Sequence, residues 1–206
     1  MGNRMPPKLK DDLLRVIETR LSDYLGGRTH PPEVATTFNY ILYDEFNKER
    51  TNGSGKGHSL KPVFVGEYFV DPVNPEQTRV FSHQGTEACS PIPITRGVIG
   101  RAVTTGRNQY VPDVTQDPEH VGCDPDMEGS ELVLVAWSEP FAPGNPHGIG
   151  YVGRRVPLGV LDLDFNVKYA LNRQERGRLK KIWEEYAKRI FPGEAQFQPR
   201  GKLCVK

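Results

Sequence analysis

The chain has 206 residues, of which 36% are hydrophobic and 26% charged. That is enough for one domain with a substantial core and too few for two full-sized domains. Lysine and arginine number 27 against 26 aspartates and glutamates, so the formal net charge is +1. This balance gives no overall field for nucleic acid or an anionic membrane, and no apolar run approaches the ~20 residues that cross a bilayer. We therefore expect neither partner.

The cysteine content points to a reducing compartment. Three cysteines are too few for a disulfide-stapled secreted domain, and the first residues lack the apolar segment of a secretory signal. We expect a cytoplasmic protein.

Two helices are predicted first in the chain. Apolar residues recur at helical spacing over 8–25, where Gly26-Gly27 ends the pattern, and again over 31–46. Residues 47–61 are polar and glycine-rich and predict a loop. Within it, 53–57 (GSGKG) lacks the first glycine and the Ser/Thr of a phosphate-binding loop, so we expect no nucleotide site there.

From Val63 onward, the spacing of apolar residues changes from the helical pattern to that of strands. Four strands are predicted, at 63–70, 78–82, 132–137 and 159–165. A Pro- and Gly-rich loop at 138–156 separates the last two. The 132–137 run is continuously apolar, as in a strand buried on both faces.

The last predicted element is a helix that begins after Asn172. Asn172 and Glu175 form a capping box at its start, and Pro192-Gly193 ends it. Helices at both ends of hairpin-connected strands predict an α+β fold, with an antiparallel β-sheet flanked by N-terminal and C-terminal helices.

Two carboxylates stand out on the last strand. Period two places Asp162 and Asp164 on one face, and Leu161, Leu163 and Phe165 on the other. Two carboxylates at this spacing repel each other, and burying either without a partner is costly. The acidic face is therefore either open to solvent or lines a pocket that receives a cation such as an amino group.

Two cysteines lie in polar, loop-like segments rather than in apolar runs. Cys89 and Cys123 can form a pair if the fold brings their Cα atoms within about 7 Å. A zinc site built with His83 and His120 is the alternative, but no Cys-x-x-Cys pair is present, and we expect no metal.

Motifs in the second half of the chain resemble those of GAF domains. They are Ile94–Val103 with its Gly-x-x-Gly turn, Tyr110–Val114, and Pro157–Asp164. The resemblance runs from about residue 30 to about residue 191. It divides the chain into an N-terminal helix at 1–29, a GAF domain at 30–192 and a C-terminal tail at 193–206. Because GAF domains take many ligands, the fold alone implies no single function.

A more specific resemblance is to free methionine-(R)-sulfoxide reductases, which are stand-alone GAF enzymes. Their pattern is matched by His120–Asp124, by Ser130–Leu134, by Gly159–Asp164, and by Ala88-Cys89 upstream. The chain departs from the family at Ile99, where a further cysteine often stands. It also departs at Phe64, where tryptophan is usual, and at Glu67, which replaces an aromatic residue and is expected to alter the pocket wall.

The resemblance implies a thiol-dependent reduction of free L-methionine-(R)-S-oxide, an antioxidant activity. Cys123 is the implied nucleophile and Cys89 the resolving cysteine of a redox-active disulfide. The implied substrate-binding residues are Glu131, Asp162, Asp164, Phe64 and Tyr68, with Glu131 and Asp164 supplying protons and Asp162 holding the substrate ammonium.

No bound cofactor is implied, and thioredoxin is the implied external reductant. A homodimer is expected only by analogy with other GAF proteins. The alternative function is a non-catalytic GAF module that binds a small molecule as a sensor. The tail cysteine, Cys204, is expected to be a bystander.

Overall fold

The computed structural model describes residues 11–48, 62–123, 128–138 and 155–192. The central parts of the predicted loops 47–61 and 138–156, and the tail 193–206 with Cys204, lie outside the described residues. The division of the chain at residues 29 and 192 stays a prediction.

The three long helices form where the sequence predicts them. They are α1 (Asp11–Leu25), α2 (Pro31–Asn47) and α4 (Arg173–Ile190). The capping box of α4 is confirmed, since the Asn172 side chain accepts from the backbone of Glu175, whose side chain accepts from the backbone of Asn172. Helix α1 packs on α2 and α4 and buries five apolar side chains in their common core: Leu13, Leu14, Ile17, Leu21 and Leu25.

One six-stranded antiparallel sheet forms the centre of the fold, in the order β3-β2-β1-β6-β5-β4. The strands are β1 (Pro62–Val70), β2 (Gln77–Gly85), β3 (Ile92–Pro93), β4 (Gln109–Val111), β5 (Ser130–Trp137) and β6 (Pro157–Phe165). The four predicted strands correspond to β1, β2, β5 and β6, which confirms the α+β prediction. Four elements were not predicted: the short edge strands β3 and β4, helix α3 (Gly97–Thr105) and the short 3-10 helix η1 (Val114–Gln116).

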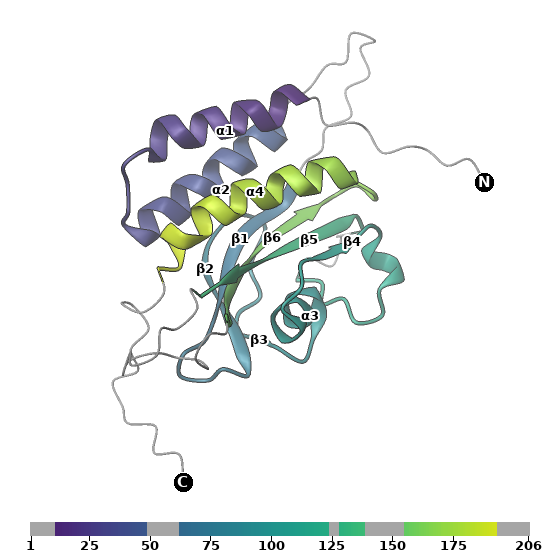
Figure 1. Ribbon diagram of the computed structural model, residues 1–206. Helices are drawn as coiled ribbons and strands as arrows, with labels where there is room; N and C mark the ends of the chain where they lie inside the picture. Colours follow the sequence, from purple (N-terminus) through teal and green to yellow (C-terminus); the bar gives the residue numbers. More distant parts are fainter. Residues whose placement is uncertain (1–10, 49–61, 124–127, 139–154, 193–206) are drawn as a thin grey trace, which may run out of the picture.

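The two faces of the sheet are covered differently (Figure 1). Helices α1, α2 and α4 lie together on one side, and α3 lies on the other. Strand alternation sorts the side chains between two apolar clusters. Leu161, Leu163 and Phe165 of β6 join the large cluster under the long helices, while Val160 joins the smaller cluster under α3. Asp162 and Asp164, in register with Val160, therefore face the α3 side.

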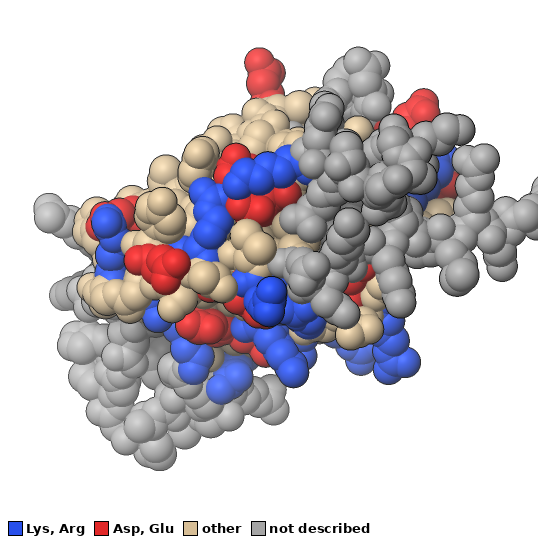
Figure 2. Space-filling view, turned by 90° about the horizontal axis from the view of Figure 1, so that it is seen from above, with Lys and Arg blue, Asp and Glu red and all other residues tan. Residues whose placement is uncertain are grey.

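Charges of both signs are interspersed on the face seen in Figure 2. Several are paired between helices: Arg20 of α1 with Asp44 and Glu45 of α2, and Arg178 of α4 with Glu18 of α1 at 3.0 Å. The solvent-exposed pair between Arg178 and Glu18 contributes little to stability, about 0–1 kcal/mol. None of the described helices combines the length and apolar character that a bilayer crossing requires.

Candidate active site

A disulfide joins the two loop cysteines. Cys89 follows β2, Cys123 follows η1, and their Cα atoms are 5.5 Å apart across 34 residues of sequence. Cys123 is exposed and Cys89 is half-buried. The pairing implied by the family resemblance is therefore confirmed.

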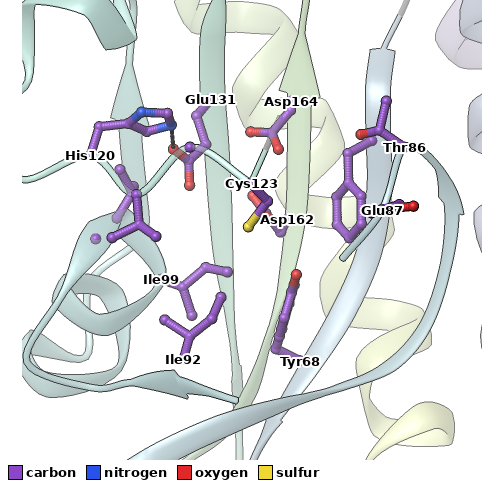
Figure 3. A pocket seen from close by; sticks show the side chains of 15 residues that line it. Tyr68, Thr86, Glu87, Ile92, Ile99, His120, Cys123, Glu131, Asp162 and Asp164 are labelled. Atoms are coloured by element: carbon purple, nitrogen blue, oxygen red, sulfur yellow. Dashed lines mark ion pairs between the residues drawn. The ribbon is translucent and has the colours of Figure 1, made fainter. Parts of the chain in front are cut away.

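Cys123 borders a pocket whose floor is the α3 face of the sheet (Figure 3). Cys123 lines this pocket together with Glu131 of β5 and with Asp162 and Asp164 of β6. In the strand register, Glu131 lies opposite Asp164, and Val133 lies opposite Asp162. One carboxylate oxygen from each of the three acids lies within 4.8 Å of the others. The acidic face of β6 thus lines a pocket, in which Asp162 is buried and Asp164 is half-buried.

The three acids share a strongly unfavourable environment for negative charge. Glu131 is 5% exposed and Asp162 is 4% exposed. Burial raises the pKa of Glu131 well above its usual range, and the negative charges of Asp162 and Asp164 raise it further. Burial and the charge of Asp164 likewise raise the pKa of Asp162. Glu131 and Asp162 therefore hold their protons to higher pH than exposed carboxyl groups do, and a cation can replace those protons.

An aromatic wall stands beside the acids, as the sequence predicts for Phe64 and Tyr68. Both side chains line the pocket and are buried, and their ring centroids are 6.1 Å apart. Gly66 lies between them on the same face of β1, where a Cβ atom would come within 2.6 Å of the Phe64 ring. The Phe64 ring therefore lies over Gly66, in space that only glycine leaves open. Ile99 also lines the pocket, so the position of the missing third cysteine is part of its wall.

The expectation that Glu67 alters the pocket wall is wrong. Glu67 alternates with Phe64 and Tyr68 along β1 and so faces the long helices. There its Oε2 accepts a hydrogen bond of 2.7 Å from Nδ2 of Asn39 in α2. Oε1 of Glu67 and Oδ1 of Asn39 are buried and have no hydrogen-bond partner. Burial raises the pKa of Glu67 well above its usual range, which the Asn39 hydrogen bond only partly offsets.

A Glu67→Gln variant is expected to be more stable than the wild type at pH 8. The raised pKa of Glu67 means that the folded state holds this proton more tightly than the unfolded state. The wild type therefore loses stability as pH rises above the unfolded pKa. Glutamine is neutral at every pH, and the cost of the buried polar group suggests a gain of roughly 1–3 kcal/mol. Chemical denaturation at pH 5 and pH 8 measures the free energy of unfolding of both proteins. A difference between Glu67→Gln and the wild type that is equal at the two pH values would contradict the burial of an ionisable group.

One pocket residue, His120, appears in the sequence analysis as a possible zinc ligand and as part of the family pattern, but without a role in the site. Nε2 of His120 lies 3.4 Å from Oε2 of Glu131, and the His120 side chain is 13% exposed. Burial lowers the pKa of His120, with the charge of Asp117 acting in the opposite direction. The His120-x-x-Cys123 spacing was the available signal, but the contact with Glu131 depends on how the connecting loop folds.

Helix α3 supports that loop. Nη2 of Arg101 binds Oδ2 of Asp117 at 2.6 Å, and the backbone nitrogen of His120 donates to the carbonyl of Asp117 at 3.1 Å. Gly97 has φ of +71°, and a Cβ atom there would come within 3.2 Å of the Val121 side chain. The loop that bears His120 and Cys123 is thus fixed on both sides to α3.

Known proteins resemble the chain over most of its length. Protein YtsP of Bacillus subtilis is 32% identical over 134 residues, which cover 65% of this chain and 72% of YtsP. A solved GAF-domain structure superposes with a TM-score of 0.67 at 20% identity, covering 95% of this chain and 93% of that one. The chain belongs to the YtsP family of GAF-domain proteins. No protein-family model matches the chain.

Several relatives of this GAF-domain protein are reductases by name. The free methionine-R-sulfoxide reductase of Saccharomyces cerevisiae is 37% identical over 112 residues, covering 52% of this chain and 54% of the yeast protein. The Neisseria meningitidis enzyme of that name, solved with its substrate, superposes with a TM-score of 0.67 at 22% identity, covering 92% of this chain and 95% of that one. The chain spans only 31% of protein ZMO0507 of Zymomonas mobilis, at 53% identity over 51 residues.

Proposed function

We propose that this GAF-domain protein reduces free L-methionine-(R)-S-oxide to methionine. The observation that carries the proposal is the Cys89–Cys123 disulfide at the rim of a pocket lined by three acids. A pocket that only bound a ligand would need no pair of cysteines at its mouth. The reductase names of the yeast and Neisseria relatives support the same function.

The chemistry begins with both cysteines reduced. The Cys123 thiolate attacks the sulfoxide sulfur while a protonated carboxyl group, Glu131 in our proposal, gives its proton to the sulfoxide oxygen. This attack joins Sγ of Cys123 to the substrate sulfur. The protonated oxygen then moves from the substrate sulfur to Sγ, and both the sulfur–oxygen bond and the new sulfur–sulfur bond break. Methionine leaves, and Cys123 carries the hydroxyl group as a sulfenic acid. The protonated state that burial favours at Glu131 is the state this step requires.

Cys89 then resolves the intermediate. Its thiolate attacks Sγ of Cys123, the sulfur–sulfur bond forms, and the hydroxide that leaves takes up a proton to give water. An external dithiol, thioredoxin in our proposal, returns two electrons and two protons and restores both thiols. A cytoplasmic location belongs to the same proposal, because reopening the disulfide requires a reducing compartment. The protein needs no bound cofactor in this cycle.

The pocket also accounts for the recognition of a free amino acid. Asp162 would hold the substrate ammonium, with Asp164 beside it, and the Phe64 and Tyr68 rings would contact the S-methyl side. A buried ammonium requires a carboxylate partner, and the three acids provide more negative charge than the empty pocket can hold ionised. The fit of an ammonium group to this cluster supports a free amino acid as the substrate.

A coupled assay tests the proposed function. It supplies free methionine-(R)-sulfoxide, thioredoxin, thioredoxin reductase and NADPH, and follows NADPH oxidation. We expect turnover with the R epimer and not with the S epimer or with N-acetylated methionine sulfoxide, which has no ammonium group. Equal background rates of NADPH oxidation with the wild type and with Cys123→Ser would contradict the proposed reductase activity. That result would favour a module that binds a ligand without chemistry.

A further inference from the structure

Glu131 needs a source of protons if it acts in every turnover. The groups closest to it are poor proton sources. Asp162 and Asp164 are acids of the same cluster. Burial raises the pKa of Tyr68, and the charges of these two acids raise it further, so the phenol holds its proton tightly. Arg101 acts on Glu131 only through its charge, and a guanidinium does not release its proton. Among the described residues that line the pocket, His120 is the one histidine.

Glu131 has polar neighbours on two sides, His120 on one and the acids of β6 on the other. Oε2 lies 3.4 Å from Nε2 of His120 (Figure 3) and has no hydrogen bond of ordinary length. On the other side, one carboxylate oxygen from each of Glu131, Asp162 and Asp164 lies within 4.8 Å of the others. Glu131 therefore stands between the His120 ring and the acids that line the pocket, where a proton can pass from one side to the other.

We propose that His120 is the outer group of a proton relay that resupplies Glu131 during the reaction. This inference rests on the proposed function. When Glu131 has given its proton to the sulfoxide oxygen, the His120 imidazolium transfers the proton on Nε2 to Oε2 of the Glu131 carboxylate. The neutral imidazole then takes a proton from solvent through its partly exposed edge. No electrons move in this exchange, and each proton that enters at His120 leaves on the sulfoxide oxygen.

The surroundings of His120 fit this role. The loop that bears His120 is anchored to α3, because its Asp117 binds Arg101. This anchoring fixes the backbone position from which Nε2 of His120 approaches Glu131. The charge of Asp117 favours the imidazolium, while burial disfavours it more strongly and lowers the pKa. A lowered pKa makes the His120 imidazolium a stronger acid than that of an exposed histidine, which favours transfer of its proton to the Glu131 carboxylate.

Kinetics of the reduced full-length protein test the relay. His120→Gln keeps a hydrogen-bond donor but cannot titrate, and we expect its kcat to fall by about 10- to 100-fold with KM nearly unchanged. Added imidazole should restore part of that rate in His120→Gln and none in His120→Gln/Glu131→Gln. His30→Gln, at the exposed start of α2, is the matched control and should behave as the wild type. A raised KM, or a loss of rate that imidazole does not rescue, would overturn the relay in favour of a structural role.

A second measurement does not depend on turnover. In the oxidised protein, the titration of the His120 ring followed by NMR should shift when Glu131 is replaced by Gln, while that of His30 should not. An unshifted His120 titration would overturn the relay whatever the activity. Absence of wild-type turnover alongside a shifted titration would contradict the proposed function instead, and so the two failures are distinguishable.

Discussion

Replacement of Cys123 by Ser is expected to abolish turnover, with a loss of at least about a thousandfold, because a serine hydroxyl at neutral pH is a far weaker nucleophile than a thiolate. Replacement of Cys89 by Ser should have a different effect. The first half-reaction still runs, each protein molecule releases one methionine, and Cys123 remains as a sulfenic acid that no thiol on the chain resolves.

Rapid-quench measurement of methionine, with dimedone labelling of the sulfenic acid, separates the two variants. Cys89→Ser should give a stoichiometric burst and a labelled Cys123, whereas Cys123→Ser should give neither. Cys204→Ser provides the matched control, since it removes the third cysteine, which lies outside the described residues. Full cycling by Cys89→Ser, or a Cys123–Cys204 link in peptide maps of the oxidised wild type, would reassign the resolving role.

Much of this fold follows from local patterns in the sequence. The Gly26-Gly27 pair ends α1, Asn172 and Glu175 start α4, and strict alternation places Asp162 and Asp164 on the face opposite Leu161 and Leu163. These features depend on neighbouring residues alone, and so the sequence predicts them. The same alternation places Glu67 on the face opposite Phe64 and Tyr68, which is why the expectation of Glu67 in the pocket wall is wrong.

Other features depend on contacts between distant segments. Helix α3 has nine residues and begins with Gly97, whose φ of +71° and contact with Val121 are set by tertiary packing rather than by helix propensity. The approach of His120 to Glu131 likewise requires the loop after η1 to fold back along α3. The sequence indicates which residues bear chemistry, but these two contacts follow only from the three-dimensional arrangement of α3, the loop and β5.

The unfavourable environment of the acids leads to a prediction about substrate binding. Burial and the charge of Asp164 raise the pKa of Asp162, so that without a cation beside it this carboxyl group holds its proton to higher pH than an exposed aspartate. Entry of the substrate ammonium should expel that proton, because a buried carboxylate becomes favourable once it is paired with a cation. Affinity should therefore be weak at acid pH, where Asp162 is protonated, and should strengthen as pH rises towards the raised pKa. Binding should also release protons, and not take them up.

Asp162→Asn is expected to lose about 2–4 kcal/mol of binding free energy and most of its pH dependence, because the amide cannot pair with the ammonium. The same variant should unfold at a temperature no lower than the wild type, since it removes one of three mutually repelling acids from the empty pocket. Calorimetry in two buffers of different ionisation enthalpy, on a Cys123→Ser background that prevents turnover, measures both affinity and proton release. Asp23→Asn, exposed on α1, is the matched control. Wild-type affinity that weakens with rising pH, or tight binding by Asp162→Asn, would show that the ammonium is held elsewhere.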